Sequence, residues 1–233
     1  MFVVIFEVQP KKERRDDYLN LAKFLKPELE KIDGFIDNER FDSTRTEGRV
    51  LSLSTWRDEK AIIRWRTLAL HHEVQEKGRF EIFEDYHLRV AEVTIDSQVP
   101  ANQKLKEQRF DLTEVGRAKI FSISEWTPSG TQRLSGADFC SSLNLPMPKT
   151  GISDHEIFES IYNPGKLLLF ISWNSTDAAE AWRPQLTGTD AFRHRCARVI
   201  RDYGMRDRRE APQYYPGVDE ENERRPQIHT TDN

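Results

Sequence analysis

The stretch LSLSTWRDEKAIIRWR at residues 51–66 recurs without a gap as LLFISWNSTDAAEAWR at residues 168–183. The alignment pairs Trp56 with Trp173, and a second tryptophan pair follows nine residues later in both copies. Tryptophan is scarce, with five in the 233 residues of the chain, so two matched pairs at one spacing indicate a duplication. Each copy reads as an apolar strand followed by a helix, which predicts the same unit in both halves of the chain.

Around the first copy, strand-like and helical patterns alternate in the order β-α-β-β-α-β. The strands are rich in β-branched and aromatic residues, and the helices carry apolar residues at intervals of three and four. The predicted elements are a strand at 2–8, a helix from 15 that stops at Asp33-Gly34, strands at 35–41 and 49–56, a helix opened by Asp58, and a strand at 86–95. This order is the split βαβ arrangement of ferredoxin-like folds.

The same order recurs in the second half, after a polar connector at 97–116. We predict strands at 117–126, 155–162 and 166–173, a short helix at 138–143, and a last strand where RCARV at 195–199 matches RVAEV at 89–93. The sequence thus predicts an α+β protein with two tandem ferredoxin-like repeats, residues 1–96 and 117–210. Their antiparallel sheets should pack face to face as an intramolecular α+β barrel. Residues 211–233 are polar and form a predicted tail.

Composition argues against several classes of protein. Lys plus Arg number 35 and Asp plus Glu number 39, a formal charge of −4 that is unlike the basic balance of nucleic-acid-binding proteins. Neither of the two cysteines has metal-ligand spacing. The apolar run at the N-terminus precedes its charges, the reverse of a secretory signal, and no run has the roughly 18 apolar residues of a membrane helix. We expect a cytoplasmic protein without a nucleic-acid or membrane partner.

The helix around Trp65 carries the residues best suited to chemistry. On a continuous helix, Ala69 and His72 share a face with Trp65, whereas His71 lies about 100° further round. One histidine should therefore face the sheet and the other the solvent, and the sequence leaves open which. An imidazole near neutrality can act as a general base. The alternatives are helix-end histidines that favour the dipole and a Trp65 that is simply part of the core, as Trp182 suggests.

Three further side chains complete the candidate site. Arg66 and Arg89 could stabilise an anion through hydrogen bonds. Tyr86 begins the strand that carries Arg89 and is a candidate for binding the substrate. With Trp65, His71 and His72 as the candidate catalytic residues, these side chains would form the walls and the donors of a pocket.

The pattern W-R-x-L-x-x-H at 65–71, followed by QEKGR and then YHLRVAEV, resembles the antibiotic biosynthesis monooxygenase family of dimeric α+β barrels. The stretch ARVIRDYGMRDRREAP at 197–212 is similar to the end of a standalone member. The resemblance covers residues 2–95 well and 117–212 more loosely. The second repeat has no histidine at the place of His71, so we expect the working pocket in the first repeat.

The resemblance implies a monooxygenase or oxidase that uses O2 on a small electron-rich aromatic or polyketide-like molecule of secondary metabolism. In that chemistry an enolate or phenolate passes an electron to oxygen directly. The protein needs no tightly bound organic cofactor and has only to bind, deprotonate and stabilise the anion in a dry pocket.

The sequence leaves open two other functions and the oligomeric state. The chain could be a haem-binding or haem-degrading oxygenase with His71 or His72 as axial ligand, although its first strand lacks the asparagine of haem-degrading relatives. It could also be a non-catalytic ligand-binding or scaffold protein, since the fold supports many roles. The two-repeat unit could in addition form a homodimer.

Overall fold

The computed structural model describes residues 1–129, 133–145, 151–182, 184 and 191–212, so the matched Arg183 and the predicted tail from 213 onward lie outside the described residues. The first repeat contains β1 (Phe2–Pro10), α1 (Arg15–Glu30), β2 (Phe35–Ser43), β3 (Val50–Trp56), α2 (Glu59–Arg66), α3 (Ala69–Lys77), a π-helical turn η1 (Gly78–Ile82) and β4 (Phe83–Asp96). The second contains β5 (Ile120–Trp126), α4 (Gly136–Ser142), β6 (Ile152–Ser160), β7 (Leu167–Trp173), α5 (Thr176–Ala181) and β8 (Phe192–Gly204).

The described strands form one closed antiparallel barrel in the order β1-β3-β2-β6-β7-β5-β8-β4. The expected α+β architecture of tandem repeats is confirmed, and the two sheets also pair along both edges. Strand β2 pairs with β6 over a short ladder, and β4 pairs with β8 from His87↔Gly204 to Asp96↔Arg195. Pairing at both edges satisfies backbone groups that an open sheet would expose.

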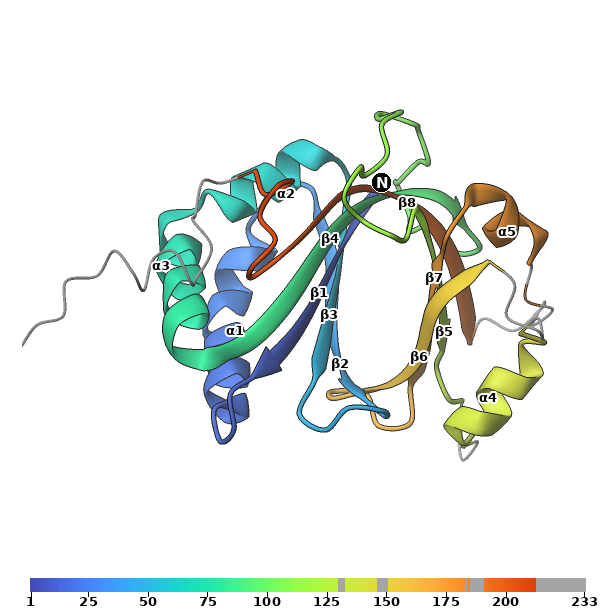
Figure 1. The fold of residues 1–233 in the computed structure, drawn as a ribbon, viewed down its shortest axis with the longest axis horizontal. Coiled ribbons are helices and arrows are strands. Elements are labelled where there is room, and N and C mark those ends of the chain that lie inside the picture. Colours follow the sequence, from blue (N-terminus) through green and yellow to red (C-terminus); the bar gives the residue numbers. More distant parts are fainter. Residues whose placement is uncertain (130–132, 146–150, 183, 185–190, 213–233) are drawn as a thin grey trace, which may run out of the picture.

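Strand alternation gives each sheet an inner and an outer face. Inner side chains of both repeats fill the barrel, among them Ile5, Leu53, Phe121, Ile123, Leu168 and Val199. Helices α1 to α3 cover the outer face of the first sheet, and α4 and α5 cover that of the second (Figure 1). In the described residues, no helix is both long enough and apolar enough to cross a bilayer.

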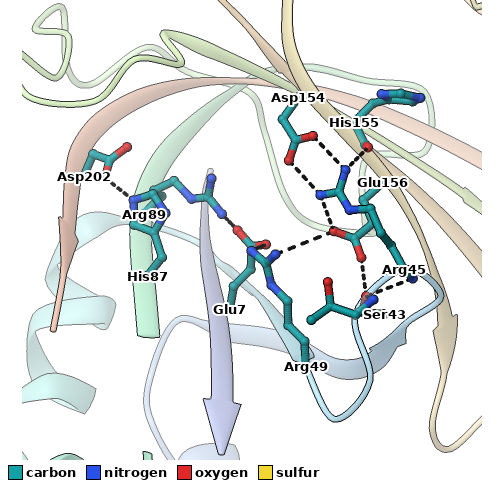
Figure 2. Close-up of polar contacts among 11 residues, drawn as sticks. Glu7, Ser43, Arg45, Arg49, His87, Arg89, Asp154, His155, Glu156 and Asp202 are labelled. Carbon is teal, nitrogen blue, oxygen red and sulfur yellow. Dashed lines mark hydrogen bonds and ion pairs between the residues drawn. The ribbon is translucent and has the colours of Figure 1, made fainter. Parts of the chain in front are cut away.

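A network of charges inside the barrel joins the repeats (Figure 2). Arg89 on β4 is 6% exposed and pairs with Glu7 on β1, and Glu7 also pairs with Arg49. Arg49 Nη1 lies 3.8 Å from Oε2 of Glu156 on β6, and Arg45 Nη2 lies 2.9 Å from the same oxygen. Buried charges are tolerated only when they are paired, so each repeat depends on the other for the solvation of its charges.

We expect the substitution Glu7→Ala to destabilise the protein, because it leaves the Arg89 guanidinium buried without its carboxylate. Removing one partner of a buried pair costs about 3–5 kcal/mol, measurable as a lower free energy of unfolding in urea at neutral pH. Glu47→Ala is the matched control, since Glu47 is exposed in the β2–β3 connection and its loss should cost less than about 0.5 kcal/mol. Equal effects of the two substitutions would contradict this role of Glu7.

Candidate active site

The second helix of the first repeat is broken at Thr67–Leu68, where the sequence predicted one continuous helix. Leu68 has φ −63° and ψ 126°, an extended conformation between α2 and α3. A helix end leaves carbonyl groups open to side-chain donors. His71 uses this opening, because its Nδ1 lies 2.9 Å from the Trp65 carbonyl oxygen. A carbonyl only accepts, so Nδ1 carries the hydrogen and Nε2 carries the lone pair.

The environment of His71 keeps its imidazole neutral. Burial lowers the pKa of His71 to about 4, against a smaller opposing effect of the bond to the Trp65 carbonyl. The ring stacks on the Trp65 indole, with centroids 4.0 Å apart and an interplanar angle of 19°. No described residue hydrogen-bonds to Nε2, so at pH 7 this atom is an available proton acceptor on a fixed ring.

His71 and Trp65 line a cavity of about 210 Å³ between the outer face of the first sheet and helices α1 to α3. Two rows of side chains cross the sheet and form the cavity floor. The first row, in spatial order, is Arg40, Ser52, Phe6, Leu88 and Tyr203. The second row is Asn38, Ser54, Val4 and Val90. In these two rows the side chains are polar on β2 and β3 and apolar on β1 and β4.

The charged side chains among the described residues that line the cavity are all positive. Apolar side chains of α1 form much of the roof, and four arginines reach the lining, namely Arg40, Arg66, Arg79 and Arg208. None of the described residues that line the cavity is acidic. An anion, or a neutral molecule that becomes anionic during reaction, would be stabilised in such an environment.

Residues of both repeats form the end of the cavity around Tyr86. Arg79 Nη1 and Arg208 Nη1 each lie 2.7 Å from the hydroxyl oxygen of Tyr86, and both donate to it. Burial raises the pKa of Tyr203 to about 12, so its phenol stays protonated. Tyr203 lies on β8 and Arg208 follows that strand, so the β4–β8 ladder brings both from the second repeat to the cavity of the first.

The structure places some of the residues singled out in the sequence at the cavity and others away from it. Trp65, Arg66, His71 and Tyr86 line the cavity. His72 is exposed, because the helix break turns His71 rather than His72 toward Trp65.

Arg89 does not reach the cavity, so its predicted role in substrate binding is not supported by its position. Strand alternation sends its side chain into the barrel (Figure 2). There it pairs with Glu7, and its guanidinium carbon lies 4.9 Å from the Phe121 ring centroid. Burial lowers the pKa of Arg89 to about 10, which still leaves the side chain charged at pH 7.

Several lining residues were missed in the sequence. Ser52 and Ser54 alternate with Leu51 and Leu53, so polar side chains on a helix-covered face were a readable signal for the polar half of the floor. The contribution of Arg208 had no such signal, because it depends on pairing between strands that are far apart in the chain.

On the outer face of the second sheet, the described apolar side chains form a core cluster. Trp182, the counterpart of Trp65, is 6% exposed and packs with its ring centroid 5.8 Å from that of Trp173. Its Nε1 donates to the Asn144 carbonyl oxygen at 3.3 Å, and it meets His194 edge to face at 5.6 Å. The same residue type is thus a cavity wall in one repeat and a core residue in the other.

The chain is similar to known proteins in sequence and in fold. The family model for antibiotic biosynthesis monooxygenase matches residues 1–77. The jasmonate monooxygenase ABM of Pyricularia oryzae is 40% identical over 220 residues, which cover 93% of this chain and 99% of that protein. A crystal structure of aldoxime dehydratase is similar in fold, with a TM-score of 0.53 and 11% identity over 85% of this chain and 80% of its own. An antibiotic biosynthesis monooxygenase structure covers 39% of this chain and 95% of its own at 17% identity and a TM-score of 0.35.

The lowered pKa of His71 predicts a defined pH dependence of stability. The value of about 4 in the folded chain lies below the ordinary 6.5, so the unfolded chain takes up the proton first. As the pH falls from 6.5 toward 4, the protein should lose stability relative to a His71→Gln variant, which cannot take up that proton. Urea unfolding of both proteins across this range measures the difference.

Nitrogen NMR of the His71 imidazole should show the tautomer with hydrogen on Nδ1. A titration midpoint of His71 above pH 6 would contradict the lowered pKa.

Proposed function

Because the chain belongs to the antibiotic biosynthesis monooxygenase family, we propose that it oxygenates a small molecule in the cavity beneath α1, α2 and α3, with His71 as the base. The observation that carries this proposal is the neutral imidazole of His71, fixed by the Trp65 carbonyl at the wall of a largely apolar cavity. In this reaction O2 is used directly, without a tightly bound organic cofactor, and the substrate is a small secondary metabolite with an activated C–H bond.

The chemistry balances without an added reductant when the substrate has an activated methylene group. Nε2 of His71 takes one proton, and the carbanion passes one electron to O2. The resulting radical and superoxide combine to form a C–O bond, and the peroxide takes the proton back from His71. Loss of the second C–H proton and of hydroxide, together as water, leaves a carbonyl. One oxygen atom enters the product, the other becomes water, and the C–H bonds supply all four electrons.

Groups around His71 suit the charges that develop in this reaction. The stacked Trp65 ring would stabilise the imidazolium that forms at His71, as aromatic faces stabilise cations. Arg66 lines the same cavity and would stabilise the oxyanion of an enolate or phenolate. Apolar side chains of α1 in the roof would help to keep water from the bound substrate, which would strengthen both interactions.

Two substrate types are supported by different observations. The name of the Pyricularia oryzae relative makes jasmonate, a cyclopentanone whose α-hydrogens are acidified by the carbonyl, the first candidate. Electron-rich aromatics such as anthrones are the second candidate, because Phe6, Phe83 and Tyr86 line the cavity and meet one another at centroid distances of 5.5–6.2 Å. Aromatic walls of this kind favour a planar ring.

The test is turnover of each candidate under labelled oxygen. We expect one labelled oxygen atom in the product, and removal of the base in His71→Gln should lower kcat by about 10²–10⁴. His72→Gln is the matched control, one residue away and exposed, and it should retain the kcat of the unmodified protein.

Three outcomes would count against the proposal. Equal turnover in His71→Gln and His72→Gln would remove His71 as the base. A shift of the Soret band of added haemin that His71→Gln abolishes would assign the cavity to haem instead. Saturable binding of both substrates without any oxygen uptake would favour a ligand-binding protein.

A further inference from the structure

Arg40 is the cation on the floor of the cavity, and its contacts are with neutral groups. Its Nη1 lies 2.9 Å from Asn38 Oδ1, and its Nε lies 3.4 Å from the Tyr18 hydroxyl oxygen. Its guanidinium carbon is 5.9 Å from the centroid of the Tyr18 ring. Among the residues that the structure describes, no carboxylate forms an ion pair with Arg40.

Strand alternation directs two of the three acidic residues of β2 to the other face, away from Arg40. The third, Asp42, lies on the face of Arg40 but pairs with Arg15 of α1 at 2.7 Å. Glu39 pairs with Lys166 of the second repeat, and Asp37 lies 3.6 Å from Arg193. Arg40 and Asn38 instead point to the helix side, where they line the cavity. The positive charge therefore stands on the polar half of a floor whose other half is apolar.

The partners of Arg40 are held in place. Asn38 Nδ2 donates to Ser52 Oγ at 3.0 Å and to the Leu53 carbonyl oxygen at 3.1 Å, which leaves its Oδ1 to accept from Arg40. A guanidinium beneath apolar helices loses solvation that neutral partners only partly replace. A planar fork with a fixed orientation matches a carboxylate, which can accept two parallel hydrogen bonds.

We propose that Arg40 binds the carboxylate of an amphipathic substrate, whose apolar body lies over β1 and β4. The rows of the floor set this orientation, with Arg40 and Ser52 at the charged end and Phe6 and Leu88 beneath the body. The inference rests on the proposed function only in that the substrate occupies the same cavity. It narrows the substrate to a small carboxylic acid with an apolar ring or chain.

Binding of three probes that differ in head-group charge tests the assignment without any turnover. Octanoate, methyl octanoate and octylamine would be titrated into the full chain near pH 7 by calorimetry. We expect octanoate to bind about 10- to 100-fold more tightly than the ester, as a charge-assisted hydrogen-bond pair provides, and the amine to bind more weakly than the ester.

Variants test whether Arg40 causes the tighter binding of octanoate than of its ester. Arg40→Gln should abolish it, and Arg40→Lys should retain part of it, because lysine keeps the charge without the fork. Asn38→Asp should also abolish it, since the new carboxylate would pair with Arg40 while keeping the shape of the side chain. Arg117→Gln removes the same charge from an exposed arginine outside the cavity and should keep the full preference.

The outcomes separate this inference from the proposed function. The carboxylate site is overturned if the chain shows no saturable binding of octanoate, if acid and ester bind equally, or if the preference survives in both Arg40→Gln and Asn38→Asp. Charge-selective binding that these two variants abolish supports the site even where no substrate is oxygenated. Oxygenation of a carboxylic acid with unchanged KM in Arg40→Gln would leave the function standing and remove the site.

Discussion

The period of two along each strand is the constraint on which the rest of the structure depends. In a barrel closed through β2–β6 and β4–β8, one side of every strand faces a shared interior and the other faces helices. Arg89 and its neighbour Leu88 illustrate the result, since the first is paired with Glu7 inside the barrel and the second lines the cavity outside. Inside the barrel, Arg49 pairs with the same Glu7 and also approaches Glu156 of the second repeat.

Duplication within one chain allowed the two outer faces to diverge. In the second repeat Trp182 is buried against Trp173, and the space between sheet and helices is core. In the first repeat that space is the cavity, yet its far end is completed by Tyr203 and Arg208 from the second. The second repeat thus contributes a wall to the cavity of the first, while its own Trp182 belongs to a core cluster.

The two-residue break between α2 and α3 decides which histidine faces the cavity. If the helix were continuous, His72 would share a face with Trp65. The extended Leu68 resets the helical phase, so the imidazole of His71 meets the Trp65 carbonyl and stacks on its ring. The contact with the Trp65 carbonyl fixes the tautomer, and burial lowers the pKa of His71 to about 4.

The sequence by itself determined the repeats and the order of the elements, because periodicity and a matched spacing are local properties of a chain. It also singled out Trp65, Arg66, His71 and Tyr86, which line the cavity in the structure. It could not determine the face on which Arg89 lies, nor that His71 rather than His72 turns inward, because each depends on strand register or helix phase. Only the tertiary structure brought Arg40 and Arg208 to one cavity. Arg40 lies on β2 and Arg208 follows β8, far away in the sequence. Hydrogen-bonded pairing across the barrel, which no local pattern encodes, is what places them together.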